Sequence, residues 1–226
     1  MSKQAILGAI QRGLKRGPLP ADAQATLNER LSRHPRHLIP ARTAVSRAEQ
    51  VALFVGFVER EFGTVDRVPD ADSVPGAVVT YLAGHNLPSI AVMAPHPELR
   101  AIPWGDRPLL MLHEGRAEAT DAVSIQHGWA AVAETGTLML PSGPDRPTTL
   151  NLLSDTAIVV LRASRIFGAY EDAWDRLRAE FGTMPRNVML VTGPSRSADI
   201  EQTLELGAHG PRHLHIVVIE DDPAAR

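Results

Sequence analysis

The sequence predicts an α/β fold with a mainly parallel sheet flanked by helices and an N-terminal helical arm. Three observations support this prediction. Short apolar runs without charge, such as Val188–Val191, are typical of strands buried on both faces. These runs alternate with capped, amphipathic helical patterns over residues 46–226. Residues 187–220 have the pattern of one strand–helix–strand unit, for which a right-handed crossover is expected.

The N-terminal segment differs in composition from the rest of the chain. Ser2 can cap a helix whose apolar residues recur at helical spacing. Four prolines interrupt residues 15–42, so this stretch is expected to be mostly irregular, with one turn of helix around Ala23–Leu31. We therefore predict a helix and proline-rich arm over residues 1–45 and a single α/β domain over residues 46–226.

The predicted domain begins with two well-marked helices. Ser46 and Glu49 form a capping box before an apolar stripe, and Ser73 with Pro75 begins a second helix. Later elements follow from short apolar runs and one amphipathic pattern. Strands are expected at Leu87–Met93, Leu109–Leu112, Ala122–Ile125, Ala130–Ala133, Leu138–Leu140 and Ala157–Leu161, and a helix at Tyr170–Phe181.

The terminal unit is expected to run from the Val188–Val191 strand through a helix at Ile200–Leu206 to a strand at His213–Ile219. Asp199 and Gln202 mark the helix start, and the GPSRS loop lies before it. A loop at the carboxyl end of a strand, with free helix N–H groups and the Arg196 guanidinium, favours an anion. The alternative is a tight turn with Arg196 as a solvated surface charge.

Composition limits the class of protein. The 226 residues are 44% hydrophobic, enough for one sizeable core, and no apolar run is long enough to span a bilayer. Because no signal-peptide core is present either, a cytoplasmic location is expected. The absence of cysteine excludes an iron–sulfur cluster held by thiolates of this chain. A net charge of −3 argues against nucleic acid as the main partner.

The charge is unevenly distributed. Residues 1–47 hold nine Lys and Arg and two Asp and Glu, a net charge of +7, so the other residues sum to −10. The basic arm can lie against the acidic body or an acidic partner, or it can be a solvated segment.

Glu134 interrupts two apolar runs in the AETGT segment at 133–137. A carboxylate beside buried strands needs a hydrogen bond or a counter-charge, and its pKa can be raised. Glu134 is therefore a candidate general base, nucleophile or substrate anchor. The alternative is an ion pair with an arginine such as Arg146 that only stabilises the turn.

Arg146 lies in a proline-flanked loop that can direct its guanidinium at a carboxylate or phosphate. The alternative is a surface arginine that binds no ligand. His209, His213 and His215 have the spacing H-x3-H-x-H, but no carboxylate accompanies them at a zinc-enzyme spacing. No metal site is therefore expected in the chain.

The AETGT segment, the Arg146 loop, TGPSRSADIE at 192–201 and GAHGPRHLHIVVI at 207–219 together resemble the LUD-domain family, in particular its lactate-utilization protein C group. That family usually has threonine where this chain has Ser197, and the exchange keeps the hydroxyl group. The resemblance implies a NagB/RpiA/CoA-transferase-like fold. It also implies a non-cluster subunit that acts with iron–sulfur-bearing subunits to oxidise L-lactate to pyruvate.

The site that the resemblance implies binds a small carboxylate or other anion. Positions carried over from the family are Glu134 and His209 as catalytic residues, and Thr135, Gly136, Thr137, Arg146, Ser195, Arg196, Ser197 and Asp199 as substrate-binding residues. His209 ranks below Glu134 and Arg196 because the predicted helix separates the 207–212 loop from GPSRS. The residues point to no particular cofactor. Alternative functions are a stand-alone sugar-phosphate isomerase or CoA-transferase that uses Glu134, and a regulatory module without chemistry.

Overall fold

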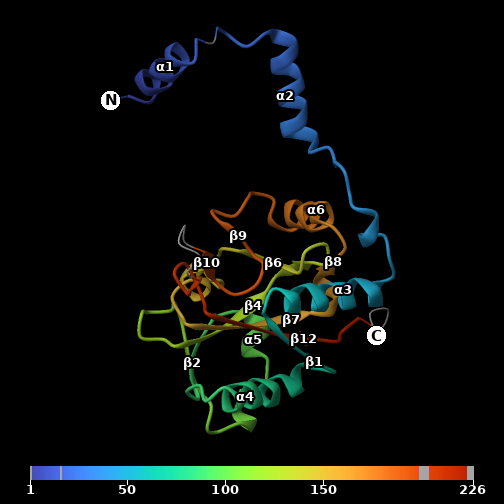
Figure 1. Cartoon of the computed structure of the whole chain (residues 1–226), viewed down its shortest axis with the longest axis vertical. Helices are drawn as coiled ribbons and strands as arrows, with labels where there is room; N and C mark the ends of the chain where they lie inside the picture. The colour runs from blue at the N-terminus through green and yellow to red at the C-terminus, as the bar shows by residue number, and fades with distance from the viewer. Residues whose placement is uncertain (1, 16, 199–203, 223–226) are drawn as a thin grey trace. The chain divides into compact units, whose positions relative to one another are not determined.

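The computed structural model describes residues 2–15, 17–198 and 204–222 of the chain (Figure 1). Its contacts divide the chain into two compact units, Met1–Leu38 and Ile39–Arg226. Each unit is described by itself.

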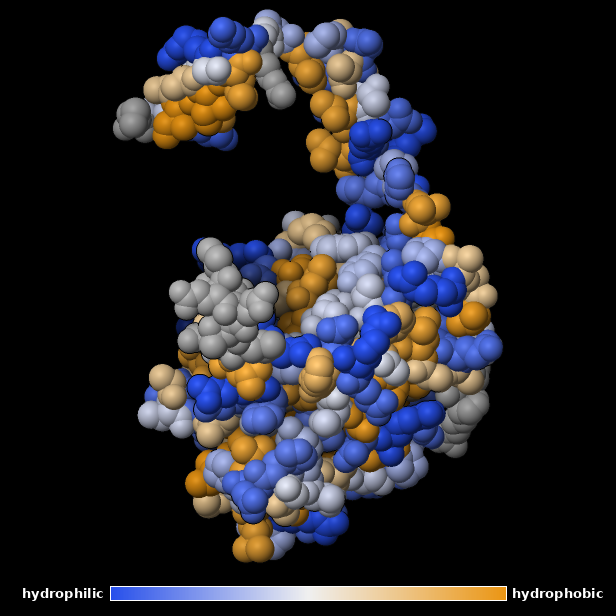
Figure 2. Space-filling model, in the orientation of Figure 1, coloured by the Kyte–Doolittle hydropathy of each residue, from blue (hydrophilic) through white to orange (hydrophobic). Residues whose placement is uncertain are grey.

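The first unit consists of two helices, α1 (Lys3–Gly13) and α2 (Ala21–Arg33). The expectation of a single helical turn between the prolines is wrong, because α2 has 13 residues and fits between Pro20 and Pro35 without a proline in its interior. The Ser2 side chain accepts a hydrogen bond from the Ala5 N–H at 3.3 Å, so the predicted N-cap of α1 is confirmed. Neither helix contains a buried residue. Apolar side chains gather along one side of each helix (Figure 2), which leaves two amphipathic surfaces exposed.

The second unit is built on a six-stranded sheet in which every neighbouring pair is parallel. Its strands, in spatial order, are β1 (Thr64–Val68), β12 (His213–Ile219), β7 (Thr156–Arg162), β4 (Val123–Gly128), β2 (Ile90–Met93) and β3 (Met111–Glu114). The central strands β12 and β7 are buried along almost their whole length. The predicted mainly parallel sheet is therefore confirmed.

Helices cover both faces of this sheet. Val217 and Ile219 of β12 pack in the cluster that includes α4 (Val74–Gly84), while Ile216 and Val218 pack in the cluster that includes α3 (Arg47–Arg60). The alternation follows from the two-residue period of a strand. Ser46 and Glu49 form the predicted capping box at the start of α3.

A smaller mixed sheet lies on the α3 side of the large sheet. Its order is β8 (Ile166–Phe167), β5 (Ala130–Val132), β6 (Thr137–Pro141) and β9 (Val188–Val191), with β6 antiparallel to both neighbours. Leu138 and Leu140 pack toward α3 and the large sheet, whereas Met139 packs beneath α6 (Tyr170–Phe181). The small sheet is thus a layer between α6 and the main core.

Short segments complete the second unit. They are the four-residue helix α5 (Pro97–Arg100) and the 3₁₀ turns η1 (Ala41–Thr43), η2 (Ala71–Ser73), η3 (Trp104–Asp106), η4 (Thr148–Asn151) and η5 (Ala163–Arg165). Among the described residues, no helix combines the length and the apolar character needed to cross a bilayer.

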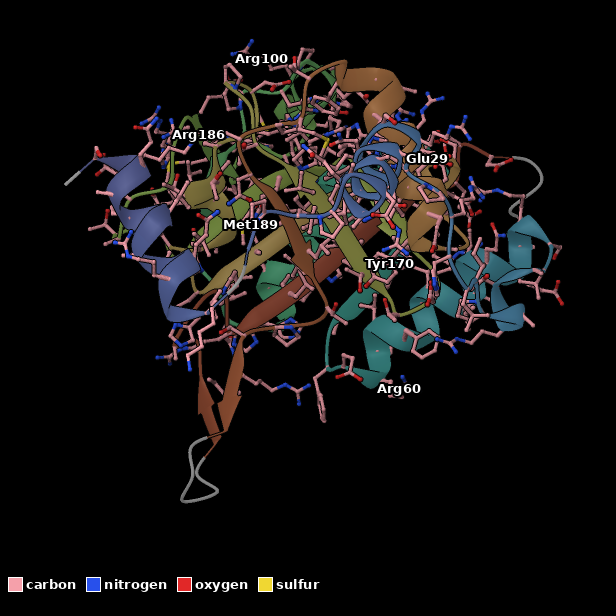
Figure 3. The ribbon with its side chains drawn as sticks, turned by 90° about the horizontal axis from the view of Figure 1, so that it is seen from above. Glu29, Arg60, Arg100, Tyr170, Arg186 and Met189 are labelled. Carbon is pink, nitrogen blue, oxygen red and sulfur yellow. The ribbon has the colours of Figure 1, made fainter. Side chains whose placement is uncertain are left out.

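The prediction of a strand–helix–strand unit over residues 187–220 is wrong. Strand β9 pairs with β6 in the small sheet, while β12 lies in the large sheet. Instead of a helix, β10 (Arg196–Ala198) pairs antiparallel with β11 (Leu204–Leu206), and the hairpin projects from the body of the unit (Figure 3). Residues 199–203 lie outside the described residues.

The physical reason lies in local sequence and burial. A helix of seven residues is marginal without tertiary packing, so a capping pattern alone does not secure it. Strand β9 is only partly buried, with Leu190 46% exposed, because it is the edge of the small sheet. A general α/β architecture is confirmed, and the particular fold name implied by the family resemblance stays a prediction.

Candidate functional site

The carboxyl ends of neighbouring strands in the large sheet bring together a group of ionisable side chains. The chain leaves β2 into His96 and Glu98, His127 is the next-to-last residue of β4, and β7 ends with Arg162. Ligand sites of open parallel α/β sheets lie at this edge. This cluster is therefore the first candidate site.

Helix α5 holds the first two of these residues in position. The His96 Nδ1 atom accepts a hydrogen bond from the Glu98 N–H at 3.3 Å, which caps the helix, and Pro97 occupies the first helical position. The backbone N–H of His96 donates to the Ala94 carbonyl at 2.7 Å. These bonds set the direction of the His96 ring.

The two histidines stack against each other. The ring centroids of His96 and His127 are 3.6 Å apart, with an interplanar angle of 12°. The Nε2 atom of His127 lies 3.6 Å from Glu98 Oε1, and Arg162 Nε donates to Glu98 Oε2 at 2.6 Å. His127 Nδ1 is buried and has no hydrogen-bond partner.

The surroundings control the charge of this cluster. Burial, together with the nearby charges of His127 and Arg146, lowers the pKa of His96 to about 4. The His127 imidazole, followed by Arg162, lowers the pKa of Glu98 to about 2. At neutral pH, His96 is therefore neutral and Glu98 is ionised.

Arg146 borders the same cluster from the loop after β6. Reciprocal backbone hydrogen bonds between Gly143 and Arg146, of 3.2 and 3.1 Å, close a tight turn that presents the arginine. Its Nη1 atom lies 3.4 Å from His96 Nε2 and its Nη2 atom 3.4 Å from Asp145 Oδ1. Arg146 Nε is buried without a partner. One donor of the guanidinium is thus unpaired within the described residues.

Three adjoining pockets connect this region with the glycine loops. The first, of about 20 Å³, lies between the two sheets and includes Gly193, Pro194 and Pro211 in its lining. The second, of about 10 Å³, shares Gln126 and Asn151 with the first.

The second pocket in turn shares Arg146 and Pro147 with an outer pocket of about 290 Å³. Residues lining the outer pocket are Arg116, Ser142, Gly143, Pro144, Arg146, Pro147, Thr148 and Thr149. Of the predicted site residues, Arg146 is therefore the one whose side chain borders the roomiest of these pockets.

Glu134 lies elsewhere, in the turn between β5 and β6. Its N–H donates to the Gly168 carbonyl at 3.0 Å, and its carbonyl accepts from Arg42 Nη2 at 3.2 Å. In the described structure the half-buried carboxylate has no ion pair, and Arg146 contacts Asp145 instead. The turn and the Arg146 loop lie at opposite ends of the five-residue strand β6, roughly 15 Å apart at the usual rise per residue. The alternative of a Glu134–Arg146 pair is wrong.

The neighbouring threonines form a hydroxyl cluster. Thr135 Oγ1 lies 2.7 Å from Thr137 Oγ1 and 2.8 Å from the Tyr170 hydroxyl, and Thr137 Oγ1 lies 2.6 Å from Thr192 Oγ1. Tyr170 is labelled in Figure 3 at the start of α6. Gly136 packs its backbone against α3. The cluster ties β6, α6 and the end of β9 together.

The two glycine loops meet each other, contrary to the prediction that a helix separates them. The backbone N–H of His209 donates to Ser195 Oγ at 3.2 Å, and the Ser195 N–H donates to the Pro211 carbonyl at 2.8 Å. Arg196 turns away to the residues that follow α3, where Nη2 donates to the Glu61 carbonyl at 3.2 Å and the guanidinium covers the Phe62 ring. Ser197 pairs in the β10–β11 hairpin through its backbone, and Asp199 lies outside the described residues.

Sequence reasoning missed His96, Glu98, His127 and Arg162. A signal was present, because His96 and Glu98 follow one predicted strand and His127 follows another. Carboxyl ends of adjacent parallel strands share one edge, so these residues could have been grouped. The strand order that makes them neighbours was not available from the sequence pattern.

Comparison with known proteins agrees with the predicted family. Residues 115–219 match the family model of the LUD domain. Lactate utilization protein C of Bacillus licheniformis is 34% identical over 109 residues, which cover 47% of this chain and 45% of that protein. Lactate utilization protein C of Bacillus subtilis is 34% identical over 102 residues, which cover 44% of this chain and 42% of that protein.

An uncharacterized protein of Neisseria meningitidis is 42% identical over 91 residues, 40% of this chain and 39% of that protein. The matched part thus spans less than half the length of each of these relatives. The crystal structure of a DUF162 family protein from Deinococcus radiodurans has a TM-score of 0.58 at 21% identity. It covers 77% of this chain and 99% of that one, which shows that the fold is shared. The predicted resemblance is confirmed: residues 115–219 are similar to the LUD domain, and the chain is similar to lactate utilization protein C.

Proposed function

We propose that this chain takes part in lactate utilization in the cytoplasm and binds a small carboxylate, such as L-lactate or pyruvate, at Arg146. The observation that carries the proposal is the Arg146 guanidinium, which borders an open pocket of about 290 Å³ and retains an unpartnered Nε donor. Arginine binds carboxylates through paired, charge-assisted hydrogen bonds. The names of the relatives supply the metabolic setting.

The lining of the outer pocket suits a hydroxy acid. Arg116 adds a second cation to the lining, and Thr148 adds a hydroxyl group. Thr149 Oγ1 already accepts from the Ala117 N–H at 3.1 Å, so it holds the pocket wall in place. Two cations and hydroxyl groups favour an anion with a polar substituent.

Calorimetric titration of the full chain with L-lactate, pyruvate and acetate tests this proposal. Arg146→Ala should weaken carboxylate binding at least about tenfold, because a hydrogen bond to a charged group contributes roughly 1.5–3 kcal/mol. Arg196→Ala is the matched control, since that arginine contacts Glu61 and should leave binding unchanged. Equal affinities of wild type and Arg146→Ala would contradict the site.

We further propose that the chain acts with iron–sulfur-bearing subunits. Its own sequence has no cysteine, so the electron carriers of a lactate oxidation must belong to another chain or a cofactor. Exposed apolar side chains on α1, including Ile6 and Ile10, supply a surface for such a partner. Ile6→Ser with Ile10→Ser should abolish co-purification of the cluster-bearing subunits.

The control for this experiment is Ala5→Ser, which changes a position of the same helix about 100° from Ile6 and about 140° from Ile10, outside their apolar stripe. Capture of cluster-bearing proteins by wild type and Ala5→Ser, but not by the double variant, is the expected result. If neither wild type nor either variant recovers a cluster-bearing protein, the proposed partnership is contradicted. The carboxylate site is then tested separately by calorimetry.

One observation favours a second function, a stand-alone enzyme that uses Glu134. In the described structure Glu134 is half-buried, its carboxylate has no ion pair, and it precedes the Thr135–Thr137 hydroxyl pair in the chain. Such a group can act as a base or nucleophile. Turnover of a sugar phosphate or a CoA thioester that Glu134→Gln abolishes and Arg146→Ala preserves would favour this alternative. A module without chemistry predicts that neither variant changes pathway flux.

A further inference from the structure

We propose that His96, Glu98 and His127 bind a divalent transition-metal ion at the carboxyl edge of the large sheet. Each side chain offers one ligand atom, and these atoms lie within 4.8 Å of one another. In the part of the chain that the structure describes, no other group of three such side chains meets this condition. The proposal goes beyond lactate utilization and does not depend on it.

Burial supports the site independently of the ligand spacing. The His96 and His127 side chains are each only 10% exposed. His127 Nδ1 is buried without a hydrogen-bond partner, although buried polar atoms nearly always have one. A nearby ion explains why an imidazole with an unsatisfied nitrogen is retained in this position.

The types of ligand atom indicate which ions the site suits. Neutral imidazoles and ionised carboxylates bind metals. Two imidazoles with one carboxylate are ligands for Zn²⁺, Mn²⁺, Fe²⁺ or Co²⁺. Calcium and magnesium ions favour oxygen ligands throughout, so they are not expected here.

Two arginines lie beside the proposed ligands and affect which further ligand the metal ion can bind. Arg162 lies 2.6 Å from Glu98 Oε2 and orients the carboxylate, as outer partners of metal ligands commonly do. Arg146 Nη1 lies 3.4 Å from His96 Nε2, so its positive charge opposes a bare cation. Asp145 Oδ2, 3.5 Å from the same nitrogen, offsets part of this repulsion, and an anion that occupies the open coordination position and contacts Arg146 offsets the rest. The site therefore favours a metal ion together with a carboxylate ligand.

Metal binding requires a local rearrangement. With bonds of about 2.1 Å, ligand atoms around a tetrahedral zinc ion lie about 3.4 Å apart, so the three groups must move closer than their present limit of 4.8 Å. The two rings must also tilt from their interplanar angle of 12°, because stacked rings direct their lone pairs in parallel. A structure of the metal-bound protein should show this tilt.

The test uses the full chain, purified without a histidine tag and stripped with a chelator. Titration with Co²⁺, followed by visible absorption, and with Zn²⁺, followed by calorimetry, should each give one ion per chain. His127→Ala and Glu98→Gln should each weaken metal binding at least about 100-fold. Loss of a residue that only orients a metal ligand costs up to about 100-fold, and loss of the ligand itself should cost at least as much. Arg162→Met should weaken it about 10-fold and leave the stoichiometry unchanged.

Two controls separate this site from other histidines. His113→Ala removes an exposed histidine that is paired with Asp121 at 3.0 Å on the neighbouring strand β3. The double variant His34→Ala with His37→Ala removes histidines of the proline-rich segment. Both should bind metal like wild type, and circular dichroism should confirm that every variant is folded.

Two results overturn the proposal. One is a folded wild-type chain that binds neither Co²⁺ nor Zn²⁺ stoichiometrically at micromolar concentrations. The other is binding that persists in folded His127→Ala and Glu98→Gln but is lost in a control variant. If His127→Ala fails to fold, the histidine NMR resonances of wild type are measured with Co²⁺ instead. Broadening of the His96 and His127 resonances, with His113 unaffected, supports the site. Broadening of His113 alone contradicts it.

Discussion

Gly136 shows at the residue scale how closely the small sheet approaches α3. Its φ is +66°, and a Cβ atom at this position would lie 2.6 Å from Phe57 Cβ and 2.8 Å from the Val58 backbone nitrogen. Both the backbone conformation and the contact exclude a side chain. The glycine of the AETGT segment therefore has a structural role, whichever ligand its neighbours bind.

We predict that Gly136→Ala lowers the free energy of unfolding by at least about 2 kcal/mol, since the helix backbone cannot move away from the added methyl group. Chemical denaturation measures this change. Gly56→Ala is the matched control, because Gly56 lies on the exposed side of α3 with no atom within 4 Å of an added Cβ. It should stabilise the protein by about 0.5–1 kcal/mol. A stable Gly136→Ala protein would disprove the close packing.

His215 is a second residue whose environment decides its role. Its side chain is 2% exposed, its ring stacks on Tyr81 at 3.9 Å, and Nδ1 lies 2.9 Å from Thr64 Oγ1. Burial lowers the pKa of His215 to about 4, although Asp66 acts in the opposite direction and His85 in the same one. This histidine of the H-x3-H-x-H pattern is thus part of the core.

The free energy of unfolding should therefore fall as the pH is lowered. Above the unfolded pKa of about 6.5, His215 is neutral in both states and its contribution is constant. Between about 6.5 and about 4, the unfolded chain binds a proton that the folded chain does not, which removes roughly 3 kcal/mol. Urea unfolding at several pH values measures the slope.

His215→Gln should have a flatter pH dependence than wild type, because it cannot bind the proton. His113→Gln removes a histidine that is exposed and should keep the wild-type slope. Identical slopes for wild type and His215→Gln would show that other groups cause the acid sensitivity.

Helix α3 contributes both to the core of the second unit and to the packing of the small sheet. It supplies Val51, Phe54 and Val58 to the core and the surface against which Gly136 packs. Its start is defined by reciprocal bonds, in which Ser46 Oγ accepts from the Glu49 N–H and Glu49 accepts from the Ser46 N–H. The N-cap therefore stabilises both the helix and the packing contacts that the helix makes.

Ser46→Ala should lower the free energy of unfolding by about 1 kcal/mol, the usual effect of losing an N-cap side chain. Ser46→Asp is the control, because aspartate accepts the same hydrogen bond and should remain close to wild type. Thermal unfolding of the three proteins measures the difference. An alanine variant as stable as wild type would mean that tertiary contacts alone determine where α3 begins.

The elements also show where sequence patterns were sufficient. Capping residues predicted the starts of α1 and α3, Ser73 with Pro75 predicted that of α4, and uncharged apolar runs predicted the central strands. Strand β1 was not predicted, because its sequence TVDRV is that of a polar edge strand. The expected terminal helix failed because short segments adopt the conformation that their tertiary partners favour.

At the scale of the whole molecule, the hydrophobic core belongs to the second unit. The described core clusters run from Val51 to Ile219, and neither α1 nor α2 contains a buried residue. The apolar side chains of the first unit thus add little buried area to the fold. Their exposure fits a surface for association.

Deletion of residues 1–38 should therefore change the free energy of unfolding by less than about 1 kcal/mol, since surface segments outside the core have small effects on stability. Denaturation of the full and shortened chains measures the change. A loss of more than about 2 kcal/mol would show that the first unit contributes to the core after all.

The sequence by itself determined the α/β class, the capped helices, the buried parallel strands and the similarity to the LUD domain, because these depend on local periodicity, capping and motif identity. Of the candidate site, it identified Arg146 and the glycine loops that border the adjoining pockets. Only the tertiary structure decided which of these residues meet. Strand order placed His96, Glu98 and His127 together and separated Glu134 from Arg146, because spatial neighbours at a sheet edge come from distant parts of the chain.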